Sequence, residues 1–203
     1  MAVCYIAGAG ECKEISIIKE TDDIVIAADA GIKHLEKVNI TPDCIIGDFD
    51  SLGVKPEGKN VIALKPEKDV TDMHAAVEIG IEKGFSRFVI YGATGGRLDH
   101  TLANIQLLAS LAERGIKAVI KDGETEIIAL CNSSVSFSEK NKGYISVFAH
   151  SDVCKGVTIK GLKYELENAE LKNTFALGVS NEFIGKESVV SVEKGILILH
   201  YCV

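Results

Sequence analysis

Residues 87–100 read Arg87-Phe88-Val89-Ile90-Tyr91-Gly92-Ala93-Thr94-Gly95-Gly96-Arg97-Leu98-Asp99-His100. The segment opens with an almost continuous apolar run, which is typical of a parallel strand covered on both faces. Glycines then supply a tight turn, and a helical spacing of apolar residues begins at Leu98. A strand that leads through a glycine turn into a helix is the repeating unit of α/β folds.

The same alternation of strand and helix signals extends from the N-terminus to about residue 130. Further apolar runs lie at 3–7, 24–28, 43–46, 61–64 and 117–120. The spacing predicts helices over roughly 31–38, from Thr71 to near Gly84, and over about 98–114. One face of the second helix carries Met73, Ala76, Val77 and Gly80, and one stripe of the third carries Leu98, Leu102, Ile105, Leu108 and Leu111. We therefore expect a mostly parallel sheet with flanking helices.

The helical spacing disappears after about residue 130. Short β-rich segments follow at 134–138, 144–149, 156–160, 175–179, 188–192 and 195–201, separated by Gly, Asn, Ser or Lys. This pattern is typical of a small antiparallel β-sandwich. The predicted fold class is α/β followed by such a sandwich, with one domain over 1–128 and the other over 129–203.

Composition excludes several classes of protein. The chain has 203 residues and a net charge of −7, which argues against a surface that tracks nucleic-acid phosphates. No stretch of about 18 apolar residues exists, so no membrane partner is expected. Six scattered cysteines without a Cys-x-x-Cys pair indicate free thiols and a cytoplasmic location. Neither the P-loop nor the complete dinucleotide-binding glycine pattern is present.

Aspartates follow several of the predicted strands at once. Asp29 follows the run at 24–28, Asp48 and Asp50 follow 43–46, and Asp72 opens the helix after 61–64. Because parallel strands end at one edge of a sheet, these carboxylates are expected to converge, and in an extended segment Asp48 and Asp50 point to one side. Close carboxylates favour a bound Mg²⁺, although aspartates are also common as turn residues.

The glycine turn at 92–99 has the features of an anion site. Backbone N–H groups at a helix N-terminus favour phosphate, and Arg97 adds a bidentate donor. The alternative is a turn selected for tight packing, with Arg97 in solvent. Lys68 is either a surface lysine or a neighbour of the acidic cluster. Among the histidines, His100 is the one close in sequence to Arg97 and Asp99.

The ordered set of motifs resembles the thiamine pyrophosphokinase family. The similarity covers the chain from about residue 25 to its end. Its motifs are Asp29-Ala30-Gly31, Gly47-Asp48-Phe49-Asp50-Ser51, Lys68-Asp69-Val70-Thr71-Asp72, Gly95-Gly96-Arg97-Leu98-Asp99-His100 with Asn104, Gly161-Leu162-Lys163-Tyr164 and Gly178-Val179-Ser180-Asn181-Glu182-Phe183. Each motif alone is weak, whereas the complete set in this order is specific.

The resemblance implies a homodimeric enzyme with its active sites between subunits. It implies transfer of the terminal diphosphate of ATP to the hydroxyethyl oxygen of thiamine, with Mg²⁺ as cofactor and AMP as the second product. Catalytic and metal-binding roles would fall to Asp48, Asp50 and Asp72. The nucleotide side would be formed by Asp29, Lys68, Thr94, Gly95, Arg97, Asp99 and Asn104. The thiamine rings would be held by Tyr164, Ser180 and Asn181.

Two other functions remain open from the residues alone. The same acidic edge would serve a pyrophosphokinase for another heterocyclic alcohol, such as a pterin. A non-catalytic sensor of thiamine or nucleotide would retain the same pocket. If the chain is an enzyme, the general base is expected to be Asp72 or Asp50.

Overall fold

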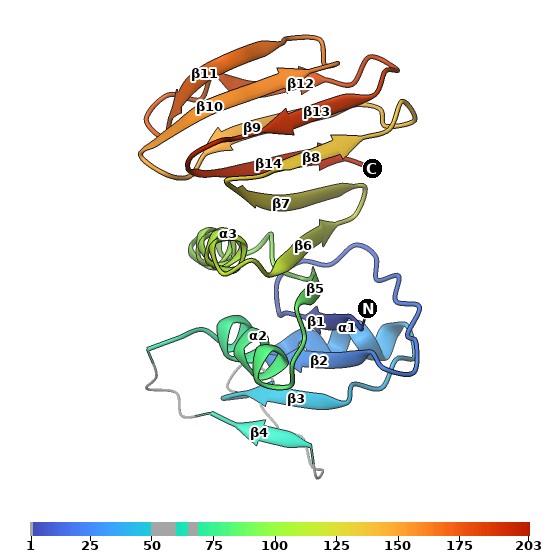
Figure 1. The fold of residues 1–203 in the computed structure, drawn as a ribbon. Helices are drawn as coiled ribbons and strands as arrows, with labels where there is room; N and C mark the ends of the chain where they lie inside the picture. Colours follow the sequence, from blue (N-terminus) through green and yellow to red (C-terminus); the bar gives the residue numbers. More distant parts are fainter. Residues whose placement is uncertain (1, 50–59, 65–68) are drawn as a thin grey trace. The chain divides into compact units, whose positions relative to one another are not determined.

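The computed structural model describes residues 2–49, 60–64 and 69–203, which form two compact units (Figure 1). The first unit comprises Met1–Leu107 and Ile116–Gly123, and the second comprises Leu108–Gly115 and Glu124–Val203. The division at residues 128 and 129, with separate ligands for the two parts, stays a prediction.

The first unit is built on a parallel sheet with the strand order β6-β5-β1-β2-β3-β4. The strands are β1 (Cys4–Ala7), β2 (Ile24–Ala28), β3 (Cys44–Gly47), β4 (Val61–Ala63), β5 (Arg87–Tyr91) and β6 (Lys117–Asp122). Their ladders are all parallel, so the carboxyl ends of the strands lie at one edge. The predicted mostly parallel sheet is confirmed.

Helices α1 (Ile32–Lys37) and α2 (Asp72–Glu82) cover the two faces of this sheet, and the 3₁₀ turn η1 (Asp29–Gly31) precedes α1 (Figure 1). Helix α3 (Leu98–Glu113) begins in the first unit, and its residues from Leu108 onward belong to the second. Leu35 of α1 packs with Val25 and Ala27 of β2. Gly80 of α2 lies against the other face, where an added Cβ would be 2.6 Å from the ring of Phe88. Since side chains alternate along a strand, α1 and α2 lie on opposite faces.

The helix predicted to begin after Thr71 is confirmed. The Thr71 hydroxyl caps α2 by accepting the His74 N–H at 3.2 Å. The predicted apolar face of Met73, Ala76, Val77 and Gly80 is the buried face. Local capping and spacing signals were therefore sufficient to place this helix.

The predicted helix over about 98–114 is present as α3, but its apolar stripe is not buried in the first turns. Leu98 and Leu102 are 70% and 55% exposed, and the buried face of the helix begins at Asn104 and continues through Leu108 and Leu111. The residues from Gly95 to His100 are all exposed, so the start of the helix extends beyond the packed part of its unit. Regular spacing predicted the helix correctly but not the length of its buried face.

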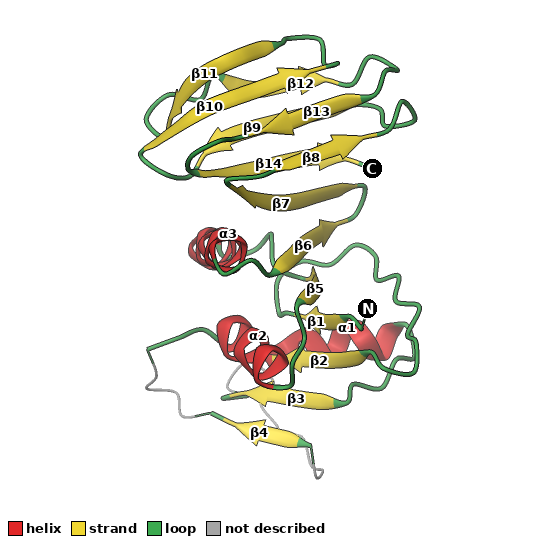
Figure 2. Ribbon diagram, in the orientation of Figure 1, coloured by secondary structure: helices red, strands yellow, loops and turns green. Residues whose placement is uncertain are grey.

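The second unit is a β-sandwich, and residues 124–203 contain strands and loops alone (Figure 2). One antiparallel sheet has the order β12-β9-β14-β7 and the other β11-β10-β13-β8. The strands are β7 (Thr125–Cys131), β8 (Ser134–Phe137), β9 (Tyr144–Ala149), β10 (Val153–Lys160), β11 (Leu166–Lys172), β12 (Gly178–Glu182), β13 (Ser188–Ser191) and β14 (Ile196–Cys202). Buried side chains of both sheets, including Ile145, Val157 and Leu199, form one core.

Two strands of the sandwich escaped the sequence prediction, and a third was misplaced. Strand β11 carries charged residues at most exposed positions and buries only Leu171, so it has no apolar run to reveal it. Strand β7 falls at the expected domain boundary, where the pattern was changing. Strand β12 was expected at 175–179 but spans Gly178–Glu182, because Phe175 and Leu177 are exposed rather than part of the ladder.

All six cysteines are free thiols, as predicted. Three of them, Cys4, Cys44 and Cys154, are buried, and burial raises the pKa of the Cys4 thiol to about 12. These thiols are packing residues of the two units. Among the helices of the described residues, none has the length and apolar character needed to cross a membrane.

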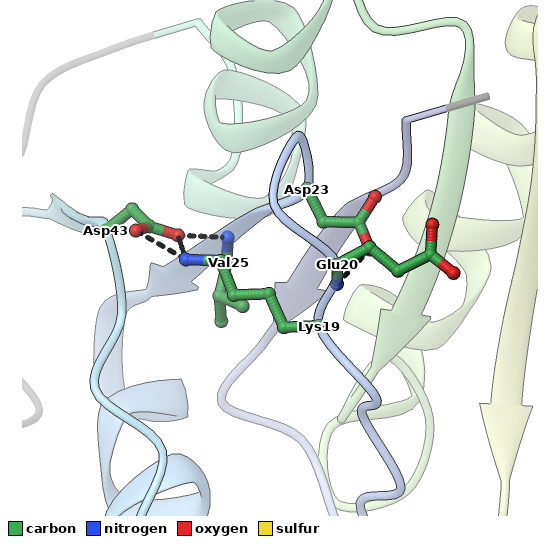
Figure 3. A network of polar contacts seen from close by, with 5 residues as sticks. All are labelled: Lys19, Glu20, Asp23, Val25 and Asp43. Carbon is green, nitrogen blue, oxygen red and sulfur yellow. Dashed lines mark hydrogen bonds and ion pairs between the residues drawn. The ribbon is translucent and has the colours of Figure 1, made fainter.

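Two aspartates hold the starts of the first strands (Figure 3). Asp23 accepts the Val3 N–H at 2.7 Å through one oxygen and the Glu20 N–H at 3.0 Å through the other. Asp43 accepts the Val25 N–H at 2.7 Å and pairs with the Lys19 ammonium group at 2.6 Å. These carboxylates satisfy backbone donors at strand starts, the opposite end of the sheet from the predicted site.

We expect Asp23→Ala to lower the free energy of unfolding by about 1–3 kcal/mol, because the buried Val3 N–H loses its acceptor. The exposed neighbour Asp22 provides the control, and Asp22→Ala should change stability by less than about 0.5 kcal/mol. Urea unfolding followed by circular dichroism measures both variants. Equal effects at the two positions would contradict the role assigned to Asp23.

Candidate functional site

A pocket lies at the carboxyl ends of β1, β2 and β5. Its lining includes Asp29 after β2, Asp72 at the start of α2, and Gly92 after β5. His100 and Asn104 of α3 complete one side. The structure thus brings predicted residues from separate chain segments to one place, as the parallel topology requires.

The end of β3 adjoins the end of β2 at this edge. The Gly47 backbone is so close to Asp29 that a Cβ on Gly47 would lie 3.1 Å from the Asp29 Cα. Asp48 follows Gly47 directly and is half-buried. Asp29 and Asp48 therefore come from neighbouring strand ends. The other predicted residues of this region, Asp50 and Lys68, lie outside the described residues.

Two residues at these strand ends have left-handed backbone conformations. Asp29 has a φ of 49° and the buried Phe49 a φ of 63°. For a bulky side chain such as Phe49 this conformation is strained, and strained residues cluster at functional sites. The segment is not extended at Phe49, so the argument that placed Asp48 and Asp50 on the same side does not hold there.

The N-terminus of α2 opens into the pocket. Its cap, Thr71, and its first residue, Asp72, both belong to the lining. Backbone N–H groups and the helix dipole give this end a partial positive charge. The pocket therefore combines acidic side chains with backbone donors suited to an anion.

A loop after β1 forms the part of the pocket that the sequence did not reveal. The Gly8 N–H donates to the Tyr91 carbonyl at 2.8 Å, and the Gly10 N–H donates to the Gly92 carbonyl at 2.8 Å. Added Cβ atoms at Gly8 and Gly10 would each lie 2.7 Å from the Gly92 oxygen. Gly8-Ala9-Gly10 lacks the third glycine of the dinucleotide-binding pattern, so the sequence did not predict this loop as part of the site. The available signal was that Gly8 directly follows a predicted strand, as Gly92 does.

Three side chains hold this loop and the glycine turn together. The Glu11 carboxylate accepts the Gly96 N–H at 3.3 Å, and His34 of α1 lies 2.8 Å from the Gly10 carbonyl through Nε2. The buried Asn104 donates to the Ala93 carbonyl at 2.7 Å. Neither Glu11 nor His34 was predicted as a site residue. Asn104 therefore stabilises the glycine turn through its backbone.

The predicted residues Arg97 and Asp99 form an exposed ion pair. The Arg97 Nε donates to Asp99 at 3.1 Å, and a second bond joins the same two groups. Hydrogen bonds from Arg97 lower the pKa of the Asp99 carboxyl. Neither residue belongs to the pocket lining, whereas Gly95 does. Thr94 is buried, and its carbonyl accepts the Glu11 N–H at 2.9 Å.

The predicted residues of the second unit gather around one loop. Tyr164 follows β10 and is 59% exposed, while Asn181 of β12 is only 3% exposed. Asn181 accepts the Tyr164 N–H at 3.0 Å and donates to the Tyr164 carbonyl at 2.7 Å. Ser180 has a φ of 57° and donates its N–H to the Ser146 hydroxyl at 3.1 Å. The amide of Asn181 thus fixes the backbone that presents the Tyr164 ring.

The donor set of the pocket fits a magnesium ion that is shared with a substrate. Within residues 2–49, 60–64 and 69–203, no three His, Cys, Asp or Glu side chains form a metal cluster. Mg²⁺ ordinarily takes one or two carboxylates and completes its shell with water and phosphate oxygens. Asp29 and Asp72 line one pocket and supply hard oxygen ligands of this kind.

Comparison with known proteins identifies the family. The model of the thiamin pyrophosphokinase catalytic domain matches residues 16–120, and that of the vitamin B1 binding domain matches residues 133–197. The chain belongs to the thiamine pyrophosphokinase family. Thiamine pyrophosphokinase from Bacillus subtilis is 34% identical over 182 residues, covering 86% of this chain and 85% of the relative. Thiamin pyrophosphokinase 1 from Caenorhabditis elegans is 26% identical, covering 70% of this chain and 62% of the relative.

Solved structures of the family have the same fold. The crystal structure of the Bacillus subtilis thiamine pyrophosphokinase aligns with a TM-score of 0.85 at 30% identity, covering 100% of this chain and 99% of the other. The yeast thiamin pyrophosphokinase structure aligns at 16% identity with a TM-score of 0.74, which shows the fold alone. The predicted arrangement of an α/β unit and a sandwich is therefore that of the family.

We expect Gly92→Ala to reduce stability by about 3 kcal/mol, because a Cβ there would overlap the Gly8 carbonyl oxygen in addition to straining the backbone. Gly96 has the same φ of 60° but open space around it. Gly96→Ala should therefore lose only about 1 kcal/mol from backbone strain. Chemical denaturation compares the two variants. A loss at Gly96 as large as that at Gly92 would refute the close-packing argument.

Proposed function

We propose that this chain transfers the diphosphate group of ATP to the hydroxyethyl oxygen of thiamine, which yields thiamine diphosphate and AMP. The observation that carries the proposal is the pocket with Asp29, Asp72 and the glycine turn in a chain of this family. Carboxylates beside backbone anion donors are the groups needed to hold a metal-bound triphosphate.

In this proposal the pocket binds the phosphates from two directions. The glycine turn at 92–95 and the N-terminus of α2 would offer N–H donors, which suit phosphate oxygens. Asp29, Asp48 and Asp72, with the predicted Asp50, would hold Mg²⁺. When bound, this ion supplies positive charge that offsets the repulsion between carboxylates and phosphates. The phosphates would also contact Gly95 and Thr94. The rest of the nucleotide would contact Arg97, Asp99 and Lys68.

The proposed reaction needs positioning more than covalent chemistry. The thiamine hydroxyl oxygen forms a bond to the β-phosphorus, and the bond from that phosphorus to the oxygen of the departing AMP breaks. The hydroxyl proton passes to a carboxylate, for which Asp72 or Asp50 is proposed. Holding the hydroxyl in line with the leaving group accounts for much of the rate in such transfers.

The thiamine side of the proposal rests on the exposed ring of Tyr164. Thiamine carries a permanently cationic thiazolium ring, which is attracted to the face of an aromatic side chain. Asn181 supports this ring through the Tyr164 backbone, and Ser180 lies next to it in the chain. A direct contact of Ser180 or Asn181 with thiamine stays a prediction.

The purified chain with ATP, Mg²⁺ and thiamine should release AMP together with thiamine diphosphate. Asp72→Asn should lower turnover by about 100-fold or more, because a carboxylate that holds metal or accepts a proton is lost. Asp22→Asn removes an exposed charge outside the pocket lining and is the control. Release of ADP, turnover of a pterin alcohol in preference to thiamine, or thiamine binding without product would each contradict the proposed reaction.

We also propose that the chain acts in the cytoplasm as a homodimer. Strand β12 lies at the edge of its sheet, and the nearby side chains of Phe148, Leu177 and Val179 are exposed. An exposed apolar sheet edge is a surface that commonly pairs with another chain. Sedimentation equilibrium should give twice the mass of one chain, and Val179→Lys should shift the population toward monomer. A monomer at every concentration would rule out the dimer.

A further inference from the structure

A lysine ammonium group lies over the ring of Tyr164. The Lys163 Nζ is 5.5 Å from the centroid of the ring and 2.6 Å from a carboxylate oxygen of Glu182. The ring is therefore already in contact with a cation that belongs to the protein, and this cation has its own counter-ion.

The backbone keeps these three side chains together. The Lys163 N–H donates to the Glu182 carbonyl at 3.0 Å. The buried Asn181 binds the Tyr164 backbone on both sides and also accepts the Glu182 N–H at 2.9 Å. The loop after β10 and the strand β12 are thus joined at this point. That register brings the side chains of Lys163 and Glu182 next to each other.

The pair is charged and partly open to solvent. The bond to Glu182 raises the pKa of the Lys163 ammonium group, so this group is protonated at neutral pH. The side chains of Lys163 and Glu182 are 44% and 36% exposed. An ion pair at this exposure is held weakly, so another cation can compete for its carboxylate and its aromatic ring.

We infer that Lys163 is a specificity-determining residue of the acceptor site, whose ammonium group occupies the place over Tyr164 that a cationic acceptor ring must take. Glu182 is then the carboxylate for which both cations compete. This inference rests on the proposed function, because it assumes that Tyr164 is the platform for the acceptor. It adds that the chain selects its acceptor by charge and that its own lysine limits the affinity.

The two charges of the pair act in opposite directions. Without Lys163, the Glu182 carboxylate and the ring are left for the incoming cation, and binding tightens. Without Glu182, the lysine cation stays near the ring without its counter-ion, and a second cation is repelled. An acceptor of the same shape but without charge senses neither change. A residue with a merely structural role would affect both acceptors alike.

The experiment measures binding of thiamine and of a neutral isostere in which a thiophene replaces the thiazolium ring. Isothermal titration calorimetry on the full chain gives both affinities. Lys163→Gln should tighten thiamine binding roughly two- to fivefold, and Glu182→Gln should weaken it by a similar factor, with the neutral isostere unchanged. Lys163→Arg retains the charge and should resemble the wild-type chain.

A second ion pair of the same unit provides the matched control. Lys160 pairs with Glu167 at 3.8 Å, and both side chains are highly exposed. Lys160→Gln changes the net charge as Lys163→Gln does, so it should leave both affinities unchanged. Thermal unfolding tests whether each variant is folded. If Lys163→Gln is not folded, Lys163→Met replaces it in the experiment.

The outcomes separate this inference from the proposed function. If the wild-type chain forms AMP from ATP and thiamine, but Lys163→Gln leaves thiamine binding unchanged or weakens it, the inference alone fails. It also fails if the variants change binding of thiamine and of the neutral isostere equally, or if Lys160→Gln acts as Lys163→Gln does. If the wild-type chain neither binds nor converts thiamine, the proposed function fails and the inference falls with it.

Discussion

The contact between the Gly8 and Gly92 backbones is the constraint on which the pocket depends. Strands β1 and β5 are parallel neighbours, so the chain leaves both at the same edge, and the two exits meet. A side chain on either glycine would meet the backbone of the other. With hydrogen only at these positions, the loop after β1 closes on the turn after β5, and its N–H groups donate to the carbonyls of Tyr91 and Gly92. This loop and this turn line the same pocket as Asp29 and Asp72.

The sheet and helix α2 could be predicted because their signals are local. Continuous apolar runs indicate buried parallel strands wherever they occur, and Thr71 with the apolar face after it defines a helix without reference to the rest of the chain. The errors lie where tertiary packing decides. Leu98 and Leu102 have the spacing of a buried stripe, but no element covers them in the described part of the chain. Strand β11 pairs through its backbone, and Leu171 is its one buried side chain.

The same distinction applies to the candidate site. Asp29 and Gly95 follow strands, Asp72 opens a helix, and the topology of the sheet brings all three to the pocket. Asn104 lies within α3 and also lines the pocket. Glu11 and His34 act through contacts with distant backbone, and Glu11 meets Gly96 across 85 residues of sequence. No periodicity or motif marks such a contact in a single sequence. The two hydrogen bonds between the Asn181 side chain and the Tyr164 backbone could not be predicted either, because an asparagine beside a serine is typical of an ordinary turn.

The two proposed substrates carry opposite charges, and a different set of charged groups is proposed to bind each of them. In the proposed function, Asp29 and Asp72 would repel an anionic triphosphate, so its binding at this pocket would depend on a cation such as Mg²⁺. Thiamine needs no such mediator, because its own positive charge suits an aromatic face and a carboxylate. At Tyr164 the chain already places a cation of its own beside Glu182. In the proposed function, charge compensation as well as shape would determine which molecule binds in each place.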